Sequence, residues 1–232
     1  MEKLVYLLTN PAPRPGETPG AALREALVEK AVPALRSAGA LQIAVNVNDE
    51  HVARGEAVAI RRSDPPICAM VSFWMHNADE RAACEAALRE HAFGLAGYLV
   101  VESRPLLHEP PVGERAPGAN LVTCIKQKPD IGYDEFIDRW NNEHRKVAVE
   151  TQSTFAYVRN AVVRRLTDEG ADWDGIVEES FPIEALSDPH VWYDCSSDDE
   201  YKRRLQRMME SVTAFLDLSV LESTPMSEYW QG

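Results

Sequence analysis

Two short segments of the chain recur later with nearly the same displacement, and this repeat constrains the fold more than any other feature. Residues 4–8 (LVYLL) resemble residues 121–125 (LVTCI), and residues 100–105 (VVESRP) resemble residues 220–225 (VLESTP). Matched ends of this kind predict two copies of one structural unit. The stretch between them, HEPPVGERAPGAN, is rich in proline and glycine and is typical of a linker. We therefore divide the chain into a first unit at 1–108, a linker at 109–119 and a second unit at 120–232.

The order of elements is the same in both units. In the first we expect strand 3–9, a proline-rich loop, helix 20–37, strands 40–47 and 66–75, helix 77–90 and strand 97–103. In the second we expect strand 120–127, helix 134–151, strands 154–165 and 175–181, helical segments 183–195 and 198–215, and a last strand at 217–223. This βαββαβ order is that of a ferredoxin-like unit, an antiparallel sheet with both helices on one face.

Such a unit leaves the second face of its sheet apolar and uncovered, so two copies gain by burying these faces together. The predicted fold class is therefore α+β, with two tandem ferredoxin-like units packed sheet-to-sheet as a pseudo-dimeric α/β barrel. A homodimer of such chains is compatible with this pattern, although the sequence does not require one.

Composition excludes several classes of function. Lysine and arginine number 24 against 37 aspartates and glutamates, a net charge of −13, which disfavours nucleic-acid binding. The longest apolar run, residues 67–75, is too short to span a membrane. The apolar stretch at the start ends at Asn10 and Pro11, too early for an export signal, so we expect a cytoplasmic protein. The four cysteines form no CxxC pair, which is typical of free thiols.

The densest group of chemically useful side chains lies on the first helix of the second unit. Phe136, Trp140 and His144 follow one another at intervals of four and therefore share one helix face. Two aromatic rings followed by an imidazole can line an apolar pocket that holds one titratable group. Histidine is the side chain best suited to exchange a proton near neutral pH.

With these residues in view, the second unit resembles the EthD family of the dimeric α/β-barrel superfamily. The matching positions are Lys128-Pro129-x-x-Gly132, Phe136-x3-Trp140-x3-His144, Arg159-Asn160, Asp174-Gly175-Ile176 and Asp217. The first unit looks like a degenerate copy, since its helix at 23–31 offers neither Trp nor His. The second unit departs from the family pattern at Tyr133, where the family has a Ser or Thr helix cap, so Tyr133 becomes a candidate pocket residue.

The resemblance implies an enzyme that often works without a cofactor and uses a histidine as acid or base. The leading hypothesis is a cofactor-independent lyase or isomerase (a decarboxylase, dehydratase or cyclase) acting on a small aromatic or conjugated organic acid in a catabolic or biosynthetic pathway. No nucleotide-binding, hydrolase or closely spaced metal-ligand motif is present, so we expect neither cofactor nor metal. His144 is the expected proton-transfer residue. The other candidates are Tyr133 for catalysis, and Phe136, Trp140, Asn141, Tyr157, Arg159 and Glu178 for substrate binding.

The strand residues carry an open question. Tyr157 and Arg159 share one face of their strand, and Glu178 and Ser180 share one face of the next. An inward Arg159 suits a carboxylate substrate, whereas an outward one is merely solvated, and the sequence does not say which face is which.

Two alternatives remain open at this point. In the first, the protein is a non-catalytic accessory protein of a degradation pathway that only binds a small ligand, and His144 is structural. In the second, it is a haem- or oxygen-dependent oxidoreductase.

Overall fold

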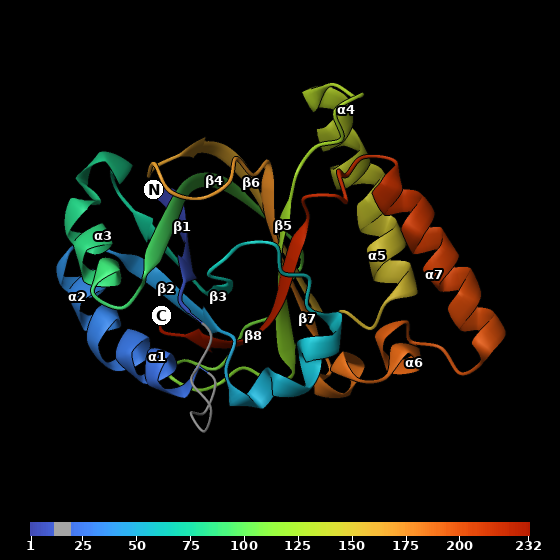
Figure 1. The fold of residues 1–232 in the computed structure, drawn as a ribbon, viewed down its shortest axis with the longest axis horizontal. Coiled ribbons are helices and arrows are strands. Elements are labelled where there is room, and N and C mark those ends of the chain that lie inside the picture. Colours follow the sequence, from blue (N-terminus) through green and yellow to red (C-terminus); the bar gives the residue numbers. More distant parts are fainter. Residues whose placement is uncertain (12–19) are drawn as a thin grey trace.

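The strands of the computed structural model close into one antiparallel barrel with helices on its outside (Figure 1). The structure describes residues 1–11 and 20–232, so the proline-rich loop expected after the first strand lies largely outside the described residues. In this part of the chain there are eight strands: β1 (Glu2–Thr9), β2 (Leu41–Val47), β3 (Ile67–Met75), β4 (Gly94–Leu106), β5 (Ala119–Ile125), β6 (Ala156–Arg165), β7 (Gly175–Phe181) and β8 (Glu222–Trp230).

The order of strands around the barrel is β1-β3-β2-β8-β5-β7-β6-β4. The first four strands in sequence are neighbours, as are the last four. The two groups join edge to edge through antiparallel pairs of β2 with β8 and of β4 with β6. Closure leaves no free sheet edge in the barrel, which removes the usual site of edge-to-edge aggregation.

The helices of each half pack against the outer face of that half's strands (Figure 1). They are α1 (Ala21–Ala26), α2 (Val32–Ser37) and α3 (Ala82–Arg89) in the first half, and α4 (Tyr133–Asp138), α5 (Arg145–Thr151), α6 (Pro189–Trp192) and α7 (Asp198–Thr213) in the second. Short 3₁₀ helices span Glu50–Val58, Ala78–Glu80 and Ile183–Leu186. None of the helices within the described residues has the length and apolar character needed to cross a membrane.

In both halves the first helix contains a π-helical segment. Leu27–Ala31 joins α1 to α2, and Arg139–His144 joins α4 to α5. In the first half a cause is visible in the sequence, because Pro33 has no N–H to donate and so interrupts the α-helical hydrogen-bond ladder. In the second half the segment contains Asn141 and Asn142, which are poor helix formers.

The predicted last strand is wrong in position. We expected residues 217–223, whereas β8 spans Glu222–Trp230. The Asp217 carboxylate accepts hydrogen bonds from the backbone N–H and the hydroxyl of Ser219, which makes this stretch a turn. Pro225 is tolerated within β8 because the pairing with β2 begins only at Ser227.

This shift also changes the meaning of one sequence match. In the first half Lys3 pairs with Val100. The matched first strands are 117 positions apart, so the equivalent of Lys3 in the second half is Asn120, which pairs with Met226. The place of Val100 is therefore held by Met226 and not by Val220. The likeness of residues 100–105 to residues 220–225 is not a structural correspondence, whereas residues 4–8 and 121–125 do lie in the first strand of each half.

Side chains along the strands alternate between the outside and the inside of the barrel, apart from register shifts in β1–β3, β2–β3 and β4–β6. On β1, Leu4 and Tyr6 face the helices, whereas Lys3, Val5 and Leu7 face the interior. One end of the interior is filled by an apolar cluster that includes Val5, Leu7, Met70, Tyr98, Val122, Ile176 and Met226. The other end is polar.

Candidate functional site

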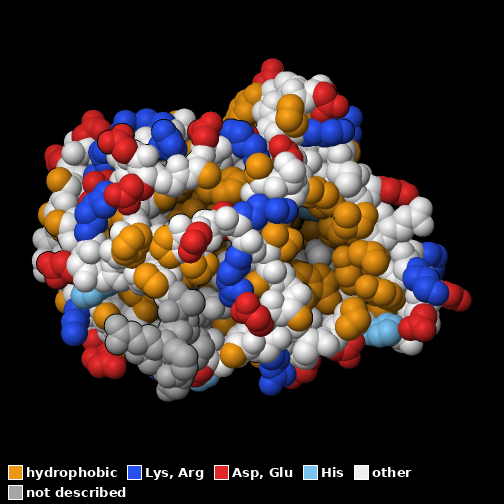
Figure 2. Space-filling model, in the orientation of Figure 1, with side chains coloured by type: hydrophobic (Ala, Val, Ile, Leu, Met, Phe, Trp, Pro, Cys, Tyr) orange, Lys and Arg blue, Asp and Glu red, His pale blue; other side chains and the backbone are white. Residues whose placement is uncertain are grey.

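A cavity of about 520 Å³ lies between the outer face of the strands in the second half and the helices that cover them. In Figure 2, hydrophobic side chains gather between the barrel and α7, where the surface is hollowed. We call this space the outer cavity. Residues from β5, β6 and β7, the π-helical segment, α6, α7 and the loop before β8 line it, and they include Trp140, His144, Tyr157, Glu179, Trp192, Tyr193, Tyr201, Met208, Val212 and Phe215.

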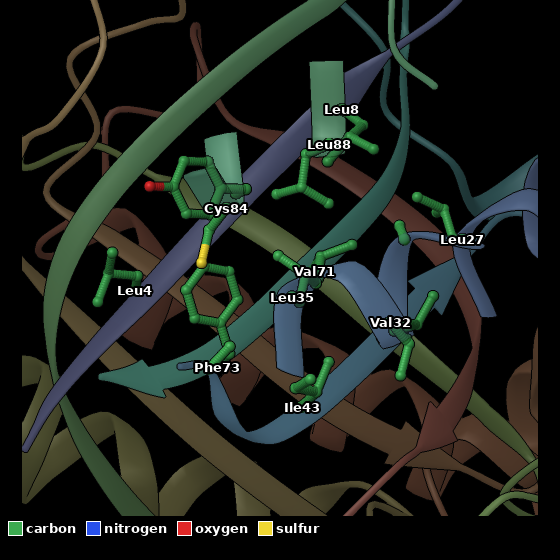
Figure 3. Packing of buried hydrophobic residues seen from close by; sticks show 14 of the residues in the cluster. Leu4, Leu8, Leu27, Val32, Leu35, Ile43, Val71, Phe73, Cys84 and Leu88 are labelled. Carbon is green, nitrogen blue, oxygen red and sulfur yellow. The ribbon is translucent and has the colours of Figure 1, made fainter. Parts of the chain in front are cut away.

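The equivalent space in the first half is filled by apolar side chains. Leu4, Leu35 and Phe73 are fully buried in it, and Figure 3 shows these side chains pointing toward one another between strands and helices. Tyr6 stacks on Phe73 with ring centroids 5.5 Å apart. This packing resembles an ordinary protein core. The space between strands and helices is therefore filled in the first half and open in the second.

His144 lies at the end of the π-helical segment and is 9% exposed. Its Nδ1 atom lies 3.0 Å from the hydroxyl oxygen of Ser211 on α7, and its ring lies 5.1 Å from that of Phe215. Burial, followed by the nearby charge of Arg159, lowers the pKa of His144 to about 4. The imidazole is therefore neutral at pH 7, with one nitrogen able to accept a proton. The hydrogen bond to Ser211 fixes the orientation of the ring.

Trp140 forms one wall of the outer cavity and is 1% exposed. Behind it, the ring of Phe136 lies 5.6 Å from the Trp140 ring. Gly175 at the start of β7 makes room for the indole, because a Cβ atom at this position would lie 2.5 Å from Trp140 Cη2. The Phe136, Trp140 and Gly175 positions of the motif thus form one packing unit.

Glu179 brings a carboxyl group into the same cavity. It pairs with Tyr157 across the β6–β7 ladder, and both side chains line the cavity. Its Oε1 atom is buried and has no hydrogen-bond partner among the residues that the structure describes, and burial raises the pKa of Glu179 to about 7. Burial, together with the charge of Glu179, raises the pKa of Tyr157 as well, so the phenol stays protonated.

Of the predicted site residues, the structure places Trp140, His144 and Tyr157 in the outer cavity. Phe136 lies behind the wall, as described. Arg159 lies on the same strand face as Tyr157, but its guanidinium is held by the Ser103 hydroxyl at 3.1 Å and the Trp140 carbonyl at 3.4 Å and does not line the cavity.

Three predicted residues do not meet there. Tyr133 is 52% exposed at the start of α4, and Asn141 is partly buried but does not line the outer cavity. Glu178 faces the barrel interior, where it accepts a hydrogen bond from Asn160 at 2.9 Å.

Sequence reasoning missed Glu179 and the wall supplied by α6 and α7. Two adjacent glutamates in a strand must face opposite sides, so one of the pair was bound to face the helices. The sequence therefore indicated that either Glu178 or Glu179 faces the helices, but it did not indicate which of the two does. The apolar stripe of Leu205, Met208, Met209 and Val212 on α7 was visible in the sequence, but it is also typical of ordinary packing.

The electrostatics of the outer cavity suit an uncharged ligand. Among the described residues, its lining includes no lysine or arginine, and its ionisable groups are His144, Glu179, Asp188 and three tyrosines. A neutral imidazole that accepts a proton and a carboxyl group that is half protonated near pH 7 form an acid–base pair in apolar surroundings.

A haem group fits this lining poorly. His144 could ligate iron, but the lining residues within 1–11 and 20–232 include no cationic side chain to pair with the two propionates of a haem. A separate group of possible metal ligands, Asp49, Glu50 and His51, lies elsewhere. Asp49 already accepts hydrogen bonds from Ser227 at 2.7 Å and Tyr229 at 2.6 Å, and its Oδ2 lies 3.5 Å from Arg24. These donors occupy the oxygens that a cation would need.

The closed antiparallel barrel with helices on its outside resembles the architecture of the dimeric α/β barrels. Residues 128–219 match the profile of the EthD domain, which covers the π-helical segment, β6, β7, α6 and α7. The EthD resemblance of this region is thereby confirmed. No curated protein matches the chain in sequence.

Solved structures share the fold over the whole chain. An "anthrone oxidase-like protein" is 12% identical with a TM-score of 0.58, and the match covers 100% of this chain and 94% of that one. A "putative monooxygenase" from Lactobacillus acidophilus NCFM is 11% identical with a TM-score of 0.50, and the match covers 100% of this chain and 96% of that one. At these identities the likeness is one of fold.

Proposed function

We propose that the protein is a cofactor-independent enzyme of the lyase or isomerase type that transfers protons on a small aromatic or conjugated substrate in the outer cavity. One observation carries the proposal: a buried, neutral imidazole and a carboxyl group with no partner in the described part of the chain line the same largely apolar space. Groups of this kind, with pKa values moved in opposite directions by burial, are the usual acid–base pair of an active site.

His144 acts as the base and Glu179 as the acid. The imidazole removes a proton from a carbon next to a carbonyl group, and protonated Glu179 donates a proton to the carbonyl oxygen, which gives the enol. Decarboxylation, dehydration and aldol-type cyclisation all pass through an enol or enolate of this kind. Ser211 orients the imidazole, and Trp140 with Tyr157 confines the substrate ring.

The lining narrows the expected substrate. The described lining residues include Glu179 but no lysine or arginine. A substrate carboxylate inside the cavity would therefore lose its hydration without gaining a cationic partner, at a cost of several kcal/mol. An organic acid therefore keeps its carboxylate at the mouth of the cavity or enters protonated. Arg159 does not serve as its partner in this arrangement.

A second candidate function is cofactor-independent oxygenation. The names of the two structural neighbours, an "anthrone oxidase-like protein" and a "putative monooxygenase", motivate it. In this function the protein would catalyse the same first step, removal of a substrate proton by His144, because the resulting anion of a conjugated substrate is electron-rich. Consumption of dissolved oxygen during turnover separates this function from a lyase or isomerase.

We further propose that the two halves are tandem ferredoxin-like copies, of which the first has lost its site. The matching element order and the π-helical segment in the first helix of each half support this. The filled space in the first half and the open cavity in the second support the loss.

Hydrogen–deuterium exchange tests the proton-transfer step without knowledge of the full reaction. The probe is 4-methylacetophenone, whose acetyl protons exchange slowly in D₂O, and 4-acetylbenzoate is its charged analogue. We expect the protein to accelerate exchange of the neutral ketone more than that of the acid. His144→Gln should lower the rate at least tenfold, and the exposed His76→Gln serves as the matched control.

The alternatives give different results. Binding of the ketone without accelerated exchange would favour a ligand-binding accessory protein. Unchanged exchange in His144→Gln would remove His144 from the mechanism.

A further inference from the structure

A second hollow, of about 400 Å³, lies inside the polar end of the barrel. We call it the inner cavity. It is formed by the opposite faces of the same strands, so the β-strand alternation separates it from the outer cavity. Its lining includes Lys3, Trp74, Glu102, Glu178, Glu228 and Trp230. The apolar cluster that fills the other end of the barrel closes the inner cavity at that end.

Most of its charges are already paired. Lys3 Nζ lies 2.5 Å from Glu102 and 3.5 Å from Glu178, and Arg104 donates to Glu102 at 2.6 Å. Asn160 supplies a further donor to Glu178 at 2.9 Å. Two cations thus compensate two carboxylates.

Glu228 is the carboxyl group that these two cations do not compensate. Within residues 1–11 and 20–232 its side chain makes no hydrogen bond and no ion pair, although it lines the cavity. Burial, and then repulsion from Glu178, raise the pKa of Glu228 to about 7, against the opposing effects of Lys3 and Arg104.

Two indole rings complete the lining. Trp230 follows Glu228 by two residues and so shares its inward face, and Trp74 lies on β3. The face of an indole attracts cations, and aromatic side chains next to a carboxylate are the usual site for an ammonium group. A neutral or anionic ligand would leave the Glu228 charge uncompensated.

We propose that the inner cavity binds a small organic cation through its ammonium group, with Glu228 as the counter-ion and Trp74 and Trp230 as its aromatic walls. This site is separate from the proposed proton-transfer site and does not depend on it.

Proton linkage follows from this arrangement. Protonated Glu228 cannot pair with the cation, so binding strengthens as the pH rises through about 7 and then levels off. The other groups that face Glu228 are Lys3 from β1, Glu102 and Arg104 from β4, Glu178 from β7, and His108 with Glu109 from the segment after β4. Binding at pH 7 therefore releases a fraction of a proton.

Calorimetry with a charged probe and its uncharged analogue tests the proposal. The probe is choline, and 3,3-dimethyl-1-butanol has the same shape without the charge. We expect saturable choline binding, at least tenfold weaker binding of the alcohol, and release of protons seen as a dependence of the heat on the buffer. Glu228→Gln should weaken choline binding at least tenfold, whereas Glu179→Gln, which alters the outer cavity, should leave it unchanged.

Several results would overturn the proposal. These are equal binding of choline and the alcohol, full binding by folded Glu228→Gln, or loss of binding in Glu179→Gln in place of Glu228→Gln. Absence of saturable binding by choline, phenethylammonium and putrescine would also overturn it and would leave a water-filled barrel end. Near-ultraviolet circular dichroism of each variant establishes that it is folded.

Discussion

Tyr157 and Glu179 face one another across the β6–β7 ladder on the outer side of the barrel, while the neighbouring Glu178 points into the interior. One strand therefore supplies a carboxyl group to each of two cavities. The outer one is apolar and holds His144, and the inner one is polar and holds Lys3. The chemistry of the two spaces differs because alternate residues of the same strands line them.

The first prediction concerns the pH dependence of stability. Burial raises the pKa of Glu179 from its ordinary value of 4.5 to about 7. Between pH 4.5 and pH 7 the Glu179 carboxyl group is therefore protonated in the folded state and ionised in the unfolded state. Glu179 therefore lowers stability progressively as the pH rises from about 4.5 to about 7, and its effect is constant above that. Glu179→Gln should be more stable than the natural protein at pH 8 by about 3 kcal/mol and equal to it near pH 4.

Urea unfolding of both proteins across this pH range measures the difference. A constant difference at every pH would show that Glu179 titrates normally in the folded state.

The second prediction concerns Gly175. An added methyl group would lie 2.5 Å from the Trp140 ring and 3.0 Å from an Ile125 side-chain carbon. Gly175→Ala should therefore destabilise the protein by about 1–3 kcal/mol and displace Trp140 into the outer cavity. Thermal unfolding and the affinity for 4-methylacetophenone should both fall. Gly132→Ala is the matched control, since no atom of the described residues lies within 4 Å of its added Cβ. Equal effects of the two substitutions would contradict the packing argument.

The third prediction concerns the buried ion pairs of the inner cavity. Lys3→Met removes the partner of two carboxylates that are less than a tenth exposed, which should cost about 3 kcal/mol at pH 7. Burial alone would raise the pKa of Glu102, but the charges of Lys3 and Arg104 lower it below its ordinary 4.5. The stabilisation is thus present above pH 4.5 and is lost as the pH falls through the lowered value.

Lys128→Met, at a partly exposed position, should change stability by less than about 0.5 kcal/mol and serves as the control. A loss of stability in Lys3→Met that is as large at pH 3 as at pH 7 would assign the effect to packing.

The fourth prediction separates orientation from binding in the outer cavity. Ser211 contacts His144 Nδ1 at 3.0 Å, and it is absent from the cavity lining. Ser211→Ala should therefore lower the rate of proton exchange about tenfold while the dissociation constant of the ketone stays unchanged. Ser211→Thr, which keeps the hydroxyl, should restore most of the rate. Equal loss in both variants would indicate a structural effect of α7.

The sequence predicted the class of elements well because each carries a strong local signal. Strand 175–181 was placed exactly, and the helix at 134–151 to within one residue, since apolar periodicity and flanking glycines mark them. The last strand was misplaced because Val220 and Leu221 look like strand residues, whereas the turn at Asp217 and Ser219 depends on side-chain hydrogen bonds that periodicity does not show.

The candidate site was predicted only in its helical part. The four-residue spacing that places Trp140 and His144 on one face is a local property, and both residues line the cavity. The choice between Glu178 and Glu179 depends on which face of β7 meets the helices, and closure of the barrel decides this. Tyr133 illustrates the same limit, since its helix start extends beyond the sheet and leaves the ring half exposed.

The state of His144 is the central claim, and nuclear magnetic resonance of protein labelled with ¹⁵N at histidine measures it directly. His144→Gln assigns the signal by its disappearance. The account predicts a neutral ring at pH 7 that titrates near pH 4 and whose nitrogen signals shift when 4-methylacetophenone is added. A ring that titrates near its ordinary pKa of 6.5 and does not respond to the ketone would contradict it.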